Sequence, residues 1–336
     1  MTSATEPSLI AMAFPSPDVG YVSDQGGAVY KTADGGRSWS LVLQGDGRWF
    51  HTLVFPDETF GLVGARNRLL RTHDGGRTWE RLTSNIEGEV MGQYFPLAPG
   101  APGRPASEPE QASTRVTERG RYFFLGRLYF LSRQVGYAMS LDGLLCTQDG
   151  GGSWAAIDTG GSAGNGLHGM CWPTPDMGIA VGDGSTILRL APFGRTVERV
   201  ASPSQEEFQA VAFTSARDGY AVGALGQVVS THDGGVTWTS QQIEPPPHLW
   251  PPHLHLLGLA FFDAVNGTAV ALTGELVRTQ DGGATWTVTP LRRRLMIGAI
   301  CAPSATTGYI LAAGRRLFKT TDAGATYHVL SVPTQR

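Results

Sequence analysis

The sequence predicts an all-β fold: a seven-bladed β-propeller of four-stranded antiparallel blades. Three observations predict it. A nine-residue box containing Asp-Gly-Gly recurs along the chain, its copies are spaced by about 40 residues or multiples of that period, and each unit repeats the same order of short β-rich runs. A fixed element that recurs along a chain indicates a repeat architecture before any local assignment is made.

The box has the form Thr-x-Asp-Gly-Gly-x-Thr-Trp and is complete at 278–286. Copies at 31–39, 71–79, 146–154 and 230–238 keep the pattern, and the copy at 319–327 has Ala323 for the first Gly and Tyr327 for Trp. We assign the boxes to stability, because near-identical copies spread around a ring cannot converge on one site. The residues so assigned are Asp34, Trp39, Asp74, Trp79, Asp149, Trp154, Asp233, Trp238, Asp281, Trp286, Asp322 and Tyr327.

The spacing of the boxes gives the number of units. Asp34 and Asp74 are 40 residues apart. Asp149 and Asp233 are 84 apart, which is two periods of 42 with a degenerate copy at 178–199 that lacks both the Asp and the Trp. Asp74 and Asp149 are 75 apart, which is one period plus an insertion. The count is therefore seven units.

Each unit contains four short runs that are punctuated by Gly, Asn and Asp, as expected for an antiparallel meander. Such a sheet cannot bury both faces alone, so copies stack, and a closed ring of them leaves only short protected edges. We expect the last strand, 327–332, to complete the seventh unit, so that the ring closes by packing of the terminal blades. The expected elements are 8–14, 20–23, 28–32 and 39–43 in blade one, 49–82 for blade two, a restart at 121–125 for blade three, then 178–199, 208–242 and 256–291.

The box also has a physical interpretation. Asp281 is expected to accept hydrogen bonds from N–H groups of its own turn. Gly282 and Gly283 would supply the positive φ angles that such a turn requires. Trp286 would pack between blades as a large apolar wedge.

These repeats resemble the Asp-box, or bacterial neuraminidase, repeat. The stretches VGYVSDQGGAVYKTADGGRSW and DGYAVGALGQVVSTHDGGVTW resemble the photosystem II stability/assembly factor family and its non-photosynthetic bacterial relatives, and the resemblance covers nearly the whole chain. It implies a propeller that helps to build or stabilise a larger complex. Photosynthetic members of the family look like exported proteins, and the N-terminus here differs from them.

Composition excludes several classes of function. A net charge of -3 gives no electrostatic reason to expect binding to nucleic acid. No stretch reaches the length of a membrane span, and residues 1–18 do not resemble a signal peptide, so the sequence predicts a cytoplasmic protein without membrane insertion. Three cysteines, Cys146, Cys171 and Cys301, lie in apolar context and are expected to be buried free thiols.

Two insertions interrupt the period, at 84–120 and 243–255. The first contains Tyr94 and Phe95 and has a proline-rich centre, and it is either a tolerated loop or a docking element. The second places Trp250 between prolines, near three histidines. His253 and His255 are expected on one side of the entering chain. The histidines leave a metal site open as an alternative to a rigid apolar knob, although no Cys or carboxylate lies beside them.

Both insertions join a fourth strand to the first strand of the next blade, so they share one face of the propeller, opposite the boxes. Binding residues concentrate on loops that a rigid scaffold holds. We therefore expect this face to bind the partner. The candidate residues are Arg48, Trp49, His51, Tyr94, Phe95, His168, Trp250, His253, His255, Arg292, Arg293 and Arg294.

An enzymatic function is the main alternative. A sialidase-type glycosidase requires an arginine triad, a Tyr nucleophile with a Glu partner and an acid/base Asp, and the Arg-Ile-Pro signature of that family is missing here. The expected inner strands are mostly apolar and poor in carboxylates. The sequence thus predicts a non-enzymatic scaffold for a protein or multiprotein assembly, with no catalytic residue, cofactor or metal; carbohydrate binding through Trp49 and Trp250 is the other alternative.

Overall fold

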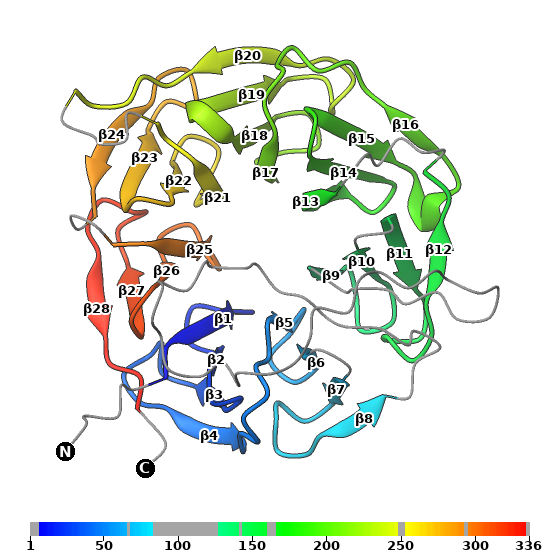
Figure 1. Cartoon of the computed structure of the whole chain (residues 1–336), viewed down its shortest axis with the longest axis vertical. Helices are drawn as coiled ribbons and strands as arrows, with labels where there is room; N and C mark the ends of the chain where they lie inside the picture. Colours follow the sequence, from blue (N-terminus) through cyan, green and yellow to red (C-terminus); the bar gives the residue numbers. More distant parts are fainter. Residues whose placement is uncertain are drawn as a thin grey trace, which may run out of the picture.

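In the computed structural model the chain forms a ring of seven antiparallel sheets of four strands each, around a central axis (Figure 1). The structure describes residues 7–65, 68–82, 127–140, 143–159, 166–247, 253–291 and 295–333. Each sheet consists of four strands that are consecutive in the sequence, so each is one blade. The predicted seven-bladed propeller is confirmed.

The strands follow one another from the axis outward in every blade. Blades 1 and 2 contain β1 (Leu9–Ala13), β2 (Gly20–Asp24), β3 (Val29–Thr32), β4 (Ser40–Leu43), β5 (Thr52–Val54), β6 (Gly61–Ala65), β7 (Arg68–Thr72) and β8 (Glu80–Leu82). Blades 3 and 4 contain β9 (Leu128–Phe130), β10 (Gly136–Ser140), β11 (Gly143–Thr147), β12 (Ala155–Ile157), β13 (Leu167–Thr174), β14 (Met177–Gly182), β15 (Thr186–Leu190), the 3-10 turn η1 (Pro192–Gly194) and β16 (Val197–Arg199). Blades 5 to 7 contain β17 (Phe208–Phe213), β18 (Gly219–Gly223), the 3-10 turn η2 (Ala224–Gly226), β19 (Gln227–Thr231), β20 (Thr239–Gln242), β21 (Leu256–Phe261), β22 (Gly267–Ala271), β23 (Glu275–Thr279), β24 (Thr287–Pro290), β25 (Ile297–Cys301), β26 (Gly308–Ala312), β27 (Arg316–Thr320) and β28 (His328–Leu330).

The core lies between blades rather than inside any one of them. Second strands such as β2, β6 and β18 are buried at every residue, because neighbouring blades cover both of their faces. Each apolar cluster joins two blades; one combines Val22 and Tyr30 of blade 1 with Leu311 and Leu317 of blade 7. A single blade therefore cannot be stable on its own.

The predicted hydrogen bonds of the box are present. Asp281 Oδ1 accepts from the backbone N–H of Thr285 at 2.9 Å and from Thr279 Oγ1 at 2.8 Å, and Asp281 Oδ2 accepts from Thr285 Oγ1 at 2.6 Å. Thr279 Oγ1 in turn accepts from the N–H of Gly283 at 2.7 Å. Gly282 and Gly283 have φ angles of 68° and 83°, as expected. Equivalent bonds form around Asp34, Asp74, Asp149, Asp233 and Asp322.

The aromatic residue that ends each box packs between its own blade and the preceding blade. Trp286 of blade 6 joins the apolar cluster that contains Tyr220 of blade 5. The indole N–H of Trp79 donates to the carbonyl oxygen of Val42 in the preceding blade at 2.9 Å. An aromatic residue at or just after the end of the inner strand lies edge-on to the indole, as Phe14 does to Trp39. The wedge interpretation of the box Trp is consistent with this packing.

Blade 4 has lost the box and uses other contacts. The turn η1 stands between its third and fourth strands, where the other blades have the box. Trp172, in its inner strand β13, stacks on Tyr137 of blade 3 with ring centroids 4.4 Å apart. The backbone N–H of Phe193 in η1 donates to the Tyr137 hydroxyl oxygen at 3.1 Å. The aromatic contact between blades is thus kept without the box.

The ring closes without a strand shared between its two ends. Blade 1 consists of β1 to β4 and blade 7 of β25 to β28, and the two pack side by side. Phe14 stacks on Tyr309 with ring centroids 3.5 Å apart, and the Tyr309 hydroxyl donates to the carbonyl oxygen of Pro17 at 2.8 Å. Closure by packing of the terminal blades is confirmed.

The start of blade 3 was predicted wrongly. Its first strand is Leu128–Phe130, whereas the expected restart at 121–125 lies outside the described residues. Phe130 meets the box residue Trp154 edge-on, which is the contact that Phe14 makes with Trp39 in blade 1. The position of the first strand is therefore set by the contact of Phe130 with the box Trp, and the apolar composition of a run does not reveal that contact.

The three cysteines are free thiols in strands, and burial raises the pKa of Cys146 and raises that of Cys301 to about 12. Among the described residues, helical structure is confined to short turns, and no helix has the length and apolarity to cross a bilayer.

Candidate protein-binding face

One face of the ring, called here the mouth face, is formed by two kinds of loop. These are the connections from a fourth strand to the next first strand and the turns between second and third strands. The axial channel opens there and has a volume of about 280 Å³, lined by all seven inner strands. Apolar side chains such as Met12, Leu53 and Ile300 line it together with His51 and Arg127.

The inner strands carry one position that differs in chemistry from blade to blade. In five blades the register shows a bulged residue after the first residue of the inner strand, and His51 stands at the same place just before β5. The occupants of this position in blades 2, 4 and 5 are His51, His168 and Gln209, and in blades 6, 7 and 1 they are Leu257, Gly298 and Ile10. The equivalent residue of blade 3 lies outside the described residues, but Arg127, just before β9, stands one residue after it, because Leu128 pairs with Ala138 as Met12 pairs with Val22. At the bulge or the residue after it, a polar side chain is therefore present in blades 2 to 5 and absent from blades 6, 7 and 1.

We call His51, Arg127, His168 and Gln209 the polar arc. Arg127 and His51 line the channel directly, and burial lowers the pKa of each below its ordinary value. The expectation of mostly apolar inner strands did not include the guanidinium of Arg127 beside the axis. Arg127 was missed because the blade was expected to begin before it.

The connection between blades 1 and 2 holds Arg48, Trp49 and His51 in a fixed place. Its Asp46 carboxylate pairs with the guanidinium of Arg68 in β7 at 2.9 Å. The Trp49 and His51 rings lie against each other with centroids 5.8 Å apart. Arg48 is exposed, and Trp49 and His51 are half-buried. These three candidate residues therefore form one small patch beside the channel.

His253 and His255 enter blade 6 just before β21. Both are exposed, and Leu254 between them is buried, so the two imidazoles lie on one side as expected. The backbone of Leu254 is fixed, because its carbonyl oxygen accepts from the N–H of Gly226 at 2.6 Å. The described part of this insertion before residue 248 follows the outer rim, where Pro245–Pro247 and Trp286 line a groove of about 530 Å³.

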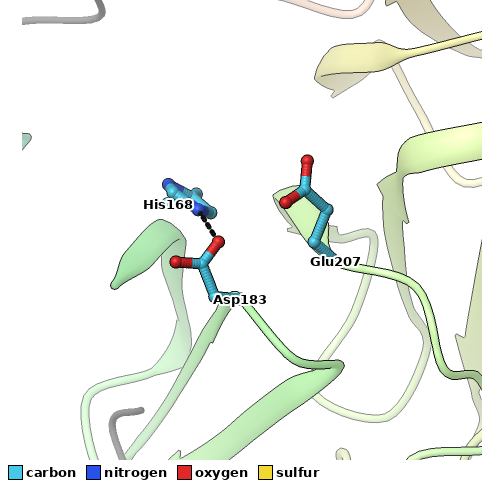
Figure 2. Close-up of side chains that lie close together, drawn as sticks. All are labelled: His168, Asp183 and Glu207. Carbon is cyan, nitrogen blue, oxygen red and sulfur yellow. Dashed lines mark hydrogen bonds and ion pairs between the residues drawn. The ribbon is translucent and has the colours of Figure 1, made fainter. Parts of the chain in front are cut away.

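His168 does not stand alone. Its Nε2 lies 2.6 Å from the Asp183 carboxylate, which accepts the hydrogen bond, and Glu207 of the next blade points toward the pair (Figure 2). One ligand-type atom of each of the three residues lies within 4.8 Å of the others. The side chains of His168 and Asp183 are 31% and 32% exposed. Sequence reasoning proposed His168 but missed Asp183 and Glu207, which follow from the register of two blades.

The remaining candidates lie outside the described residues. These are Tyr94 and Phe95 in the first insertion, which itself falls in the undescribed segment 83–126, together with Trp250, Arg292, Arg293 and Arg294. Arg48, Trp49, His51, His168, His253 and His255 are the candidates that the structure places, and all of them are on the mouth face.

The fold and this face define the class of the molecule: a seven-bladed propeller with an uneven, polar mouth. Among curated proteins, the photosystem II assembly protein Ycf48 of Thermosynechococcus vestitus is 27% identical over 178 residues, which is 48% of this chain and 51% of that protein. The chain thus matches about half the length of that relative. No model of a protein family matches the sequence.

Two solved structures share the fold over nearly the whole chain. One is YCF48 bound to D1 peptide, with a TM-score of 0.64, 19% identity and coverage of 96% of this chain and 94% of the other. The second is YCF48 from Cyanidioschyzon merolae, with a TM-score of 0.68, 18% identity and coverage of 96% and 98%. At these identities the likeness shows the shared fold.

Proposed function

We propose that this chain is a non-enzymatic scaffold that holds a protein partner on its mouth face and thereby helps to assemble a larger complex. The observation that carries the proposal is the asymmetry of the polar arc. The backbone repeats seven times, yet a polar side chain stands at the bulge of the inner strand or at the residue after it in four consecutive blades, and at neither place in the other three. A stabilising role would repeat with the fold, as the boxes do.

The comparisons support a polypeptide as the ligand. YCF48, whose fold is similar, has been solved with a D1 peptide bound to it, and the curated relative is named as an assembly protein. The same fold supports many unrelated activities, so this likeness alone does not decide the function. The half-buried Trp49, which lies against His51, favours contact with a protein over open stacking on a sugar.

Site-specific photo-crosslinking tests the proposal. A benzophenone amino acid is placed at Trp49 or His253 on the mouth face, and at Arg37 or Arg77 as exposed positions in the boxes of the opposite face. The variants are expressed in cells of the source organism, and crosslinked proteins are identified by mass spectrometry. The proposal expects one protein to be captured from both mouth positions and from neither box position. Capture of the same protein from the box positions alone would contradict it.

A further inference from the structure

The geometry points to a divalent transition-metal site at His168, Asp183 and Glu207, on the mouth face between blades 4 and 5. Among the residues that the structure describes, this is the one group of three His, Cys, Asp or Glu side chains whose ligand atoms come within 4.8 Å of one another. Figure 2 shows His168 and Asp183 in contact, with the Glu207 carboxylate beside them on the next blade. The inference goes beyond the proposed scaffold function and does not depend on it.

The three side chains come from rigid backbone. Asp183 follows β14, where its N–H donates to the carbonyl oxygen of Gly166 at 3.0 Å and its own carbonyl accepts from Thr186 at 3.1 Å. Glu207 precedes β17, and its carbonyl oxygen accepts from the N–H of Ala224 at 3.1 Å. His168 occupies the bulge of β13. Fixed attachment of all three ligands lowers the entropy cost of closing them around an ion.

The repeat shows that the fold does not require these residues. The hydrogen bond that positions Asp183 recurs at Ala224, Leu272 and Ala313. In each case the backbone N–H donates to the carbonyl oxygen of the residue that directly precedes the inner strand of the same blade. The three site positions therefore exist at other junctions. At the junction of blades 5 and 6 they hold Gln209, Ala224 and His255, and at the junction of blades 6 and 7 they hold Leu257, Leu272 and Met296. Only the junction of blades 4 and 5 among these three carries a full set of ligands.

The donor set selects the kind of ion. Imidazole suits zinc, copper, iron and nickel, whereas magnesium and calcium prefer sites made of oxygen alone. In a tetrahedral zinc site, bonds of about 2.0–2.2 Å separate neighbouring ligand atoms by roughly 3.3 Å. The His168–Asp183 pair is at 2.6 Å and must open slightly, while the Glu207 carboxylate closes inward by rotation of a flexible side chain. The ion replaces the proton that now lies between imidazole and carboxylate.

Zinc binding by the full-length chain tests the site. The protein is stripped of metal with a chelator, and ZnCl₂ is titrated in by calorimetry. The variants His168→Gln and Asp183→Ala place in blade 4 the residues that blade 5 holds at the same positions, namely Gln209 and Ala224, so the fold is expected to accept both. We expect one equivalent of Zn²⁺ on the wild-type chain and an affinity at least about tenfold lower in each variant.

Matched controls separate this site from other histidines. His51→Gln changes the equivalent position in blade 2, and His255→Ala removes an exposed histidine of the same face; both are expected to bind Zn²⁺ like the wild type. MgCl₂ and CaCl₂ at the same concentrations are expected to give no binding heat at this site. Absence of Zn²⁺ binding to the wild type, equal affinity in the two ligand variants, or equal binding of Mg²⁺ would each overturn the proposal. The measurement uses no partner, so it is independent of the crosslinking result.

Discussion

The ammonium group of Lys319 in blade 7 donates a hydrogen bond of 2.9 Å to the carbonyl oxygen of Gly35, the first Gly of the box in blade 1. The contact spans the junction where the two ends of the ring meet. The same arrangement recurs elsewhere, where a cation on a third strand reaches a Gly carbonyl of the next box. The other pairs are Lys31 with Gly75, Arg71 with Gly150 and Arg189 with Gly234. Blade 3, whose next blade lacks a box, has Cys146 at this position.

These hydrogen bonds predict that the junction between the two ends of the ring is as sensitive to loss of the cation as a junction inside the ring. Lys319→Met keeps the aliphatic stem but removes the donor to Gly35, and Lys31→Met does the same inside the ring. Each change is expected to lower the free energy of unfolding by about 1 kcal/mol, since a charged donor is lost at a partly exposed site. Urea denaturation of both variants measures this. A loss for Lys31→Met with none for Lys319→Met would mean that the ends of the ring do not meet as described.

The box carboxylates predict a loss of stability in acid. Hydrogen bonds from the Thr285 side chain and backbone lower the pKa of Asp281 to about 2, and those from Ser38 lower that of Asp34 to about 2. Because the folded-state pKa lies below the unfolded value of about 4, the stabilisation is present above pH 4 and is lost as the pH falls toward 2.

Melting temperature as a function of pH, for the wild type and Asp281→Asn, measures this effect. The variant is expected to be less stable than the wild type at neutral pH, and the difference is expected to shrink between about pH 4 and pH 2. A difference that stays constant over this range would show that the Asp281 charge has no part in stabilising the turn.

The box of blade 7 contains a strained residue. Ala323 occupies the place of the first Gly and has a φ angle of 54°, where the equivalent Gly282 has 68°. The left-handed region costs a residue with a Cβ roughly 1–2 kcal/mol, which exceeds the entropy cost of Gly. Ala323→Gly is therefore expected to raise the free energy of unfolding by up to about 1 kcal/mol. The control Ala325→Gly, two residues on and without a positive φ, is expected to lower it; a stabilising effect there would remove the strain argument.

Much of the fold follows from the sequence because the box is a local device. Asp281 bonds to atoms within four residues of itself, so its motif and its structure coincide. The period then gives the number of blades, and the ranges expected for blades 1 and 5 agree with β1–β4 and β17–β20. The position of β9 was missed because it depends on Phe130 packing against Trp154, which are 24 residues apart.

The candidate site was less predictable because it, too, depends on contacts between residues that are distant in the sequence. The face on which His51, His168 and His255 lie could be predicted, because it follows from the order of the strands alone. The cluster of His168 with Asp183 and Glu207 depends on tertiary register. Asp183, in the turn after β14, has to lie beside the bulge of β13 in its own blade and beside the residue that precedes β17 in the next blade. A comparison of aligned blades shows these substitutions, since Asp183 stands where blades 5, 6 and 7 have Ala224, Leu272 and Ala313.

The affinity for the crosslinked partner, measured with purified proteins, tests most directly the claim that the mouth face holds a protein. Three forms are compared: the wild type, the mouth variant Trp49→Ala/His51→Ala, and the box-face variant Arg37→Ala/Arg77→Ala, each with its melting temperature as a check of folding. The account predicts a Kd at least about tenfold higher for the mouth variant and an unchanged Kd for the box-face variant. A mouth variant that binds like the wild type, with weakened binding in the box-face variant, would contradict it.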